Sequence, residues 1–218
     1  IALGIPVFLS YTGFAMMLLM VNIALVNIAG NDAQLLISAH GILNRVFMLI
    51  FLPVLGLMIA FQTFAGFNYG AQRNDRVIEV LKIALIITTL YSILWSVIMI
   101  GFPELIFQAF SNDQLLISAA ANISSIVFIA FITIGIAMIC PALFQALGFA
   151  KPAAFLNALH TYFLLLPALF LYSWLYPTTF SEYLTVDSLW WLFPIADAIA
   201  AIAVGFYTWY FVKRLKII

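Results

Sequence analysis

The apolar stretch from Leu35 to Phe67 constrains the fold more strongly than any other part of the chain. A helix over these residues is roughly 50 Å long at about 1.5 Å per residue, which exceeds the ~30 Å thickness of bilayer hydrocarbon. Arg45 lies within it, and a polar exit that carries Arg73 and Arg76 follows. The stretch therefore predicts a helix that crosses a membrane, projects beyond it and keeps one guanidinium inside the span.

The composition extends this prediction to the whole chain. Of the 218 residues, 67% are hydrophobic and 7% are charged, whereas about a quarter of the residues in a soluble domain are charged. The long apolar runs lack the two-residue alternation of a membrane barrel, so their backbone groups must be satisfied within helices. We therefore expect an all-α polytopic membrane protein in contact with the lipid bilayer and not with nucleic acid.

Short polar breaks divide the chain into six apolar segments, which we expect to form one six-helix transmembrane bundle over residues 1–218. Four prolines inside the segments predict kinks, because proline removes a helical hydrogen bond. The expected helices cover residues 4–28, 35–67, 77–102, 115–147, 152–175 and 189–212, and the prolines are Pro53, Pro141, Pro167 and Pro194.

The cations are distributed unevenly over the breaks. All but Arg45 follow the second, fourth or sixth segment, and the other three breaks carry only acidic charges. Lysine and arginine in short loops favour the cytoplasmic side. This pattern predicts an even number of crossings with both termini in the cytoplasm. We expect the membrane to be the cell (plasma) membrane, an inner membrane.

Two charged side chains lie at similar depth inside the predicted spans. Arg45 is about ten residues, or ~15 Å, below the outer end of its helix, and Asp197 is about eight residues below the outer end of the last one. An intramembrane charge costs at least about 2.5 kcal/mol, so both should face the protein interior or a water-filled cavity. One hypothesis pairs Arg45 with Asp197; the alternative gives each its own solvated site. Asn44 is expected to share the cavity of Arg45, and Asn22 lies slightly shallower on the first helix.

Other polar residues within the spans have two open interpretations. Gln62 and Gln145 either join helices by hydrogen bonds, which is the common role, or line a substrate or ion pathway. His160 is able to titrate near neutral pH, but a single histidine is more often structural. The only cysteine, Cys140, lies in an apolar run, where we expect a buried thiol. No nucleophile and base pattern, metal-ligand spacing or phosphate loop is visible, so we expect neither an enzyme nor a cofactor.

A series of short motifs runs over nearly the whole chain. They are Gly4-Ile5-Pro6, Ala39-His40-Gly41-Ile42 with Arg45, Pro53-Val54-Leu55-Gly56, Asn68-Tyr69-Gly70-Ala71-Gln72 with Asp75-Arg76-Val77, Phe144 to Pro152, and Leu164 to Pro167. As an ordered set, these motifs resemble the multidrug and toxic compound extrusion (MATE) family, specifically its C-terminal half.

The resemblance implies one six-helix lobe of a twelve-helix secondary transporter. Such a protein exports amphipathic or cationic small molecules by alternating access, coupled to H⁺ or Na⁺, and this lobe would pair with an N-terminal six-helix lobe in the same polypeptide or a second chain. Two alternatives stay open: a lipid-linked saccharide flippase of the same superfamily, and a non-transporting six-helix membrane subunit.

One departure from the family concerns ion coupling. Some members carry coupling carboxylates on the helices that correspond to residues 4–28 and 115–147, and here neither span contains an acidic residue. Arg45 matches an arginine of some members. With Asn44, Asp197, Asn22, Gln62 and Gln145, it forms our predicted substrate or ion pathway.

Overall fold

The computed structural model describes residues 4–175 and 185–215, and within them the chain is helical. The first three segments are long helices: α1 (Gly4–Ile28), α2 (Ala33–Gly70) and α3 (Asn74–Gly101). The short turn η1 (Gly30–Asp32) joins α1 to α2, so the second helix starts earlier and ends later than the predicted 35–67.

The remaining three segments are interrupted. The fourth consists of α5 (Gln114–Val127), the 3-10 turn η2 (Ala130–Thr133) and α6 (Ile134–Ala146), after the short helix α4 (Pro103–Phe107). The fifth consists of α7 (Ala150–Ala158), the π-helix η3 (Leu159–Leu165) and α8 (Leu166–Leu175). The sixth consists of α9 (Val186–Trp190) and α10 (Leu192–Leu215).

These helices meet the length and composition needed to cross a membrane. Five spans in the described ranges qualify individually, and the α5 to α6 pair makes a sixth if its two bent halves count as one. The chain is therefore a multi-pass all-α membrane protein. Many of its large apolar side chains lie on the outside of the bundle, Phe64, Ile86, Phe170 and Ile202 among them, as contact with lipid tails requires.

The bend in the fourth segment is not at its proline. The two halves meet at 46° across residues 128 and 129, whereas Pro141 lies inside α6. The neighbouring helix α3 supports the break, because the Ser92 hydroxyl donates to the Ile132 carbonyl at 3.2 Å. A side chain from another helix can satisfy such a freed backbone group in a membrane, so the contact with α3 stabilises the backbone just after the bend.

The fifth segment widens just before its proline. The π-helix η3 ends at Leu165, two residues before Pro167. Proline lacks the N–H of the α-helical ladder, and its ring clashes with the carbonyl four residues earlier. A single wide turn relieves this conflict without ending the helix. The predicted kink at Pro167 therefore takes the form of a π-helix that contains His160.

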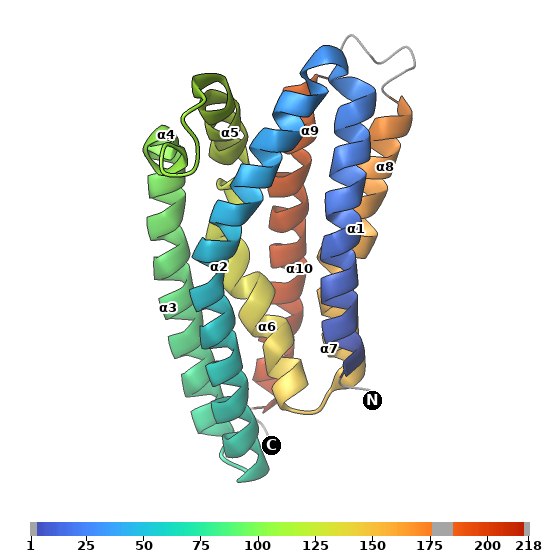
Figure 1. The fold of residues 1–218 in the computed structure, drawn as a ribbon. Coiled ribbons are helices and arrows are strands. Elements are labelled where there is room, and N and C mark those ends of the chain that lie inside the picture. The colour runs from blue at the N-terminus through green and yellow to red at the C-terminus, as the bar shows by residue number, and fades with distance from the viewer. Residues whose placement is uncertain (1–3, 176–184, 216–218) are drawn as a thin grey trace.

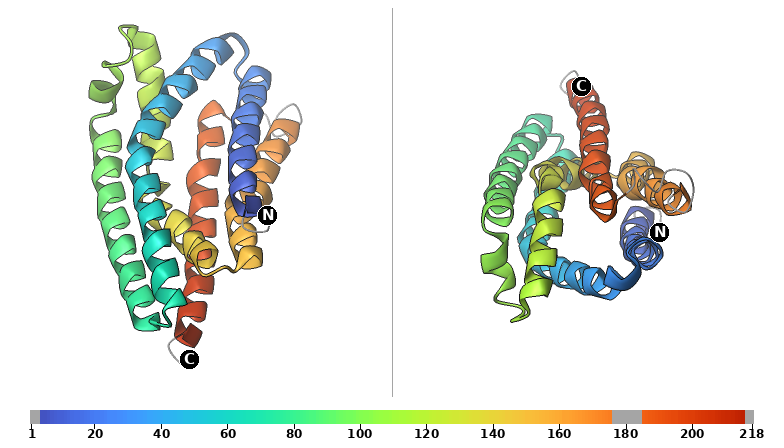
Figure 2. Two further views of the ribbon diagram at one scale, coloured as in Figure 1. Left: turned by 60° about the horizontal axis from the view of Figure 1, so that its bottom comes forward. Right: turned by 90° about the horizontal axis from the view of Figure 1, so that it is seen from above.

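Figure 1 shows that α1 starts, and α10 ends, at the same end of the bundle. The α2 to α3 turn and the α6 to α7 turn lie at that end too. In the sequence, Arg73 belongs to the first turn, Lys151 follows the second, and Lys213 is in the last turn of α10. Seen from above in Figure 2, α3 lies at one side, α1 and the α7 to α8 segment at the other, and α10 between them. The folded chain thus sorts its loop cations to one end, as the sequence predicts.

Candidate functional site

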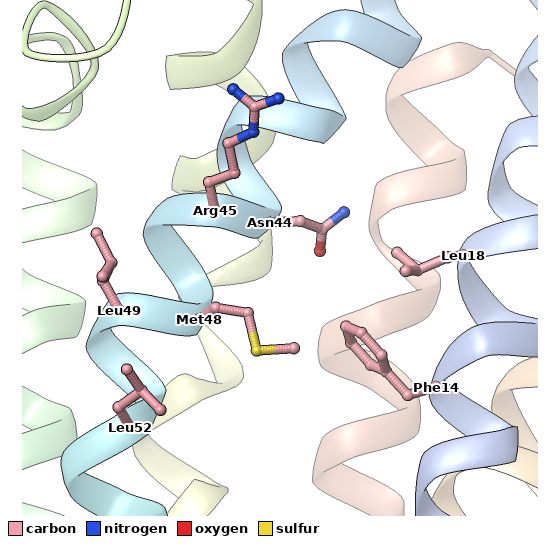
Figure 3. A pocket seen from close by; sticks show the side chains of 7 residues that line it. All are labelled: Phe14, Leu18, Asn44, Arg45, Met48, Leu49 and Leu52. Carbon is pink, nitrogen blue, oxygen red and sulfur yellow. The ribbon is translucent and has the colours of Figure 1, made fainter.

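A groove between α1 and α2 is the candidate site (Figure 3). Its volume is about 510 Å³, and two of its lining residues are polar while the rest are apolar. In Figure 3, Phe14 and Met48 point toward one another across it. The lining residues are Phe14 and Leu18 from α1 and Asn44, Arg45, Met48, Leu49 and Leu52 from α2.

Helical spacing explains how the sequence builds this groove. Phe14 and Leu18 are four residues apart, and so are Asn44 and Met48, which places each pair on one face of its helix. Arg45 belongs to the neighbouring row of α2 that continues to Leu49. Apolar side chains thus form almost the whole groove surface, to which the Asn44 amide and the Arg45 guanidinium contribute little.

Asn44 is held in place by a buried neighbour. Its Nδ2 lies 3.1 Å from Nε2 of His40, one turn earlier on α2. The His40 ring is buried and packs against Trp190 with ring centroids 5.4 Å apart. His40 is therefore an internal support for the groove wall.

Arg45 lines the groove together with Asn44, and its side chain is exposed in this lobe. In Figure 3 it runs upward along α2, away from Met48. The ion pairs of the described residues do not include Arg45. Its charge is therefore available to a bound molecule or to another protein surface, and its use as a pathway residue stays a prediction.

Asp197 does not pair with Arg45. Its Oδ1 lies 2.9 Å from Nε2 of His160, and both side chains are a little under one third exposed. Nε2 itself is buried and makes no aligned hydrogen bond, so the contact is a close approach of the two side chains rather than a directed bond. The pairing hypothesis was wrong because counting residues gives depth along the membrane normal but not position around the bundle.

The π-helix that carries His160 also contacts α1. Nδ1 of His160 lies 3.3 Å from the Thr161 hydroxyl. The Tyr162 hydroxyl lies 2.7 Å from Thr12 Oγ1 and 3.2 Å from the Leu9 carbonyl. Gly13 permits this approach, since a β-carbon there would lie 3.0 Å from atoms of both Thr161 and Tyr162.

The other predicted pathway residues lie outside the groove. Gln62 donates from Nε2 to Oε1 of Gln145 at 3.1 Å, which ties α2 to α6 and matches the helix-joining interpretation. Asn22 is half-buried on α1 and does not line the groove. A pathway role for these three residues stays a prediction.

Sequence reasoning missed the apolar half of the groove and the contact between His160 and Asp197. The four-residue spacing of Phe14 and Leu18 was a usable signal for the first. The polar run His160-Thr161-Tyr162 shortly before Pro167 was a signal for the second. Within the described ranges, no three histidine, cysteine, aspartate or glutamate side chains gather as metal ligands would, and Cys140 is buried as expected.

Solved structures with the same fold are transporters. One is a transporter of the MOP superfamily from Pyrococcus furiosus whose binding pocket is described as having reversed polarity, with a TM-score of 0.83 and 17% identity over 98% of this chain and 46% of that one. A MATE in complex with MaL6 has a TM-score of 0.84 and is 17% identical, over 99% of this chain and 46% of that one. The inward-facing conformation of a multidrug resistance MATE family transporter has a TM-score of 0.80 and is 19% identical, over 98% of this chain and 47% of that one.

A curated relative is multidrug and toxin extrusion protein 1 of Mus musculus, which is 24% identical over 131 residues, or 60% of this chain and 23% of that protein. The chain thus spans about a quarter of the mouse protein in that match, and a little under half of the solved structures. The model of the MatE family matches residues 6–171. Since that match covers most of its length, the chain belongs to the MatE family, the multidrug and toxic compound extrusion family that its motifs resemble.

Proposed function

We propose that the chain forms one lobe of a secondary active transporter that exports amphipathic small molecules. Family membership and the fold support transport as the general activity. The observation that carries the proposal is the groove between α1 and α2, whose surface is almost wholly apolar and whose lining residues include Asn44 and Arg45. Soft apolar walls with few polar groups accept varied amphipathic molecules, and the flexible Met48 thioether adapts to different shapes.

The groove has protein on the α1 and α2 sides and is otherwise open, and the chain covers a little under half of the solved structures. We therefore propose that a second six-helix lobe, in the same polypeptide or another chain, completes the binding site. Rocking of the two lobes would expose the site to each side of the membrane in turn, with influx of H⁺ or Na⁺ as the driving force. In this arrangement the end that carries Arg73, Lys151 and Lys213 faces the cytoplasm of the cell.

The charge of the groove restricts the substrate. Arg45 is the charged residue of the lining, and it disfavours a cation close to it. Export of cations would then need acidic groups from the completing lobe, whereas neutral amphipathic molecules need none. This lobe by itself supplies apolar surface and one positive charge.

The test is efflux of a fluorescent amphipathic compound from proteoliposomes that contain the complete natural protein. Met48→Trp fills the groove and should abolish most of the efflux. The matched control is Met16→Trp, which alters an exposed methionine of α1 that does not line the groove. Wild-type vesicles that move no such compound under either an H⁺ or a Na⁺ gradient, or a Met48→Trp protein with normal rates, would refute the proposal.

A further inference from the structure

The contact between His160 and Asp197 joins two spans inside the bundle. His160 lies ten residues after the start of α7, which is about 15 Å along the helix axis. Its π-helix η3 packs against α10, and Nε2 comes within 2.9 Å of Asp197 Oδ1. Intramembrane ionisable residues are costly and mark ion or proton pathways, and π-helices occur frequently at functional sites.

The short distance favours a state in which one of the two groups carries a proton. A bare ring nitrogen and a carboxylate oxygen are both acceptors, so a separation of 2.9 Å is repulsive unless one of them carries hydrogen. With one proton on the imidazole, at the nitrogen beside the carboxylate, Nδ1 is bare. A second proton then binds at Nδ1, which gives an imidazolium beside the carboxylate.

Thr161 fits both of these states. Its hydroxyl lies 3.3 Å from Nδ1 and can donate to the bare nitrogen or accept from Nδ1–H after the nitrogen gains a proton. The imidazole and carboxylate are partly exposed, although Nε2 itself is buried. The pair is therefore reachable for a proton and has a partner group that adjusts to each protonation state.

Few other titratable groups surround the pair. Of the described helices that pack against η3 or α10, α1 and α8 contain tyrosine but no charged residue. Lys151 is nine residues from His160, at the start of α7, and Asp187 is ten residues from Asp197, on α9. The remaining titratable groups on these elements are Tyr11, Cys140, Tyr162, Tyr172, Tyr207, Tyr210, Lys213 and Arg214.

The pair is mechanically connected to the groove. Thr161 and Tyr162 of η3 meet α1 at Gly13, and Tyr162 is hydrogen bonded to Thr12. The next residue of α1 is Phe14, which lines the groove. The Thr161 side chain, whose hydroxyl faces Nδ1 of His160, thus also packs through its methyl group on the helix that forms one groove wall.

We propose that the His160 and Asp197 pair is a proton-binding site of this lobe, and that its protonation state is transmitted through η3 and α1 to the substrate groove. This inference rests on the proposed transport function and assigns the coupling ion as H⁺. A proton enters from the acidic side and binds Nδ1, Thr161 changes from donor to acceptor, and release to the other side restores the first state. Substrate and proton bind to different sites, the first formed in part by α1 and the second on η3, which packs against α1.

The test compares two activities of the complete natural protein in proteoliposomes: uptake driven by an imposed pH gradient, and substrate exchange without a gradient. Asp197→Asn should lower the ratio of gradient-driven uptake to exchange by about tenfold, the scale of a typical coupling between sites. Asp187→Asn, an exposed acidic residue on α9, serves as the matched control and should leave the ratio unchanged. An unchanged ratio in Asp197→Asn would overturn the inference, and so would an equal loss of both activities in a protein that elutes as a folded species.

A second measurement does not depend on transport. In weakly buffered detergent solution with a pH indicator, substrate addition to the wild type should change the number of bound protons, and His160→Gln should remove most of that change. A wild type that exchanges substrate but responds only to Na⁺ and shifts no protons would refute the proton site and leave the transport function intact. A wild type that exchanges no substrate would refute the proposed function itself.

Discussion

Arg45 and Asp197 are two intramembrane charges of opposite sign with very different surroundings. Arg45 lies on the groove face of α2, exposed in this lobe and outside the ion pairs of the described residues. Asp197 lies 2.9 Å from His160, between α10 and a π-helix that packs closely on α1. Because the net cost of a buried charge depends on its partners, the first is free to meet a ligand and the second is already engaged within the protein.

The largest effect should come from reversing the charge of the free residue. A unit charge roughly 6 Å from a ligand charge contributes about 3 kcal/mol at an effective dielectric constant of about 20, and water in the open groove reduces this. Arg45→Glu should therefore tighten binding of a cationic amphipathic compound by about tenfold to a hundredfold and weaken an anionic one. Equilibrium binding of a matched cation and anion to the complete protein measures both changes.

Arg45→Gln is the control for this prediction, because it removes the charge and keeps a polar side chain of similar length. It should give intermediate affinities for both compounds. If the cation and the anion respond identically to Arg45→Glu, the side chain does not face the ligand and the contrast with Asp197 fails.

The second effect concerns stability, and here substitution of Asp197 should have a larger effect than substitution of Arg45. Asp197→Leu leaves Nε2 of His160 buried beside an apolar group in place of a carboxylate at 2.9 Å, which we expect to cost about 2 kcal/mol, in the range for a buried polar atom without a polar neighbour. Arg45→Leu leaves no such orphan and should change stability by no more than about 0.5 kcal/mol. Thermal unfolding in detergent compares the two. Equal shifts in the midpoint would contradict the view that only Asp197 is engaged.

The smallest effect is the change in stability when a glycine near each of the two charges is replaced by alanine, which tests how tightly the protein packs there. A β-carbon at Gly13 would press on Thr161 and Tyr162 at 3.0 Å, whereas one at Gly41, a turn before Arg45, meets nothing within 4 Å. Gly13→Ala should destabilise by about 1 kcal/mol through overpacking. Gly41→Ala should be neutral or stabilise by about 0.5 kcal/mol, because alanine suits a helix interior better than glycine.

The unfolding midpoints of the two alanine variants make this comparison directly. Gly13→Ala should also reduce gradient-driven uptake, since it disturbs the contact between η3 and α1. A Gly13→Ala protein as stable and as active as Gly41→Ala would show that α1 at Gly13 is packed no more tightly than α2 at Gly41.

More of the fold than of the candidate site could be predicted from the sequence. Long apolar runs and polar turns located the spans, because hydrophobic thickness and backbone satisfaction leave one solution for such segments. The bend of the fourth span was predicted at Pro141 and found at residues 128 and 129, where Ser92 of another helix satisfies a carbonyl. That support is a tertiary contact and leaves no local trace in the sequence.

The candidate site shows the same division residue by residue. The cost of an intramembrane charge was enough to place Arg45 at a cavity, and the structure places it in the groove beside Asn44. The partner of Asp197 was predicted wrongly. Two residues at equal depth can lie on opposite sides of a bundle, and only the packing of η3 on α10 brings His160 to this carboxylate.

The sequence by itself determined that this chain is a helical membrane protein of the MatE family with its loop cations at one end, because these properties depend on composition, segment length and motif order along one dimension. The tertiary structure alone decided that α1 and α2 form a groove, that Gln62 meets Gln145, and that His160 meets Asp197. Those pairings depend on the rotation of each helix about its axis and on its neighbours. Side-chain packing sets both, and the hydrophobicity of the spans does not encode them.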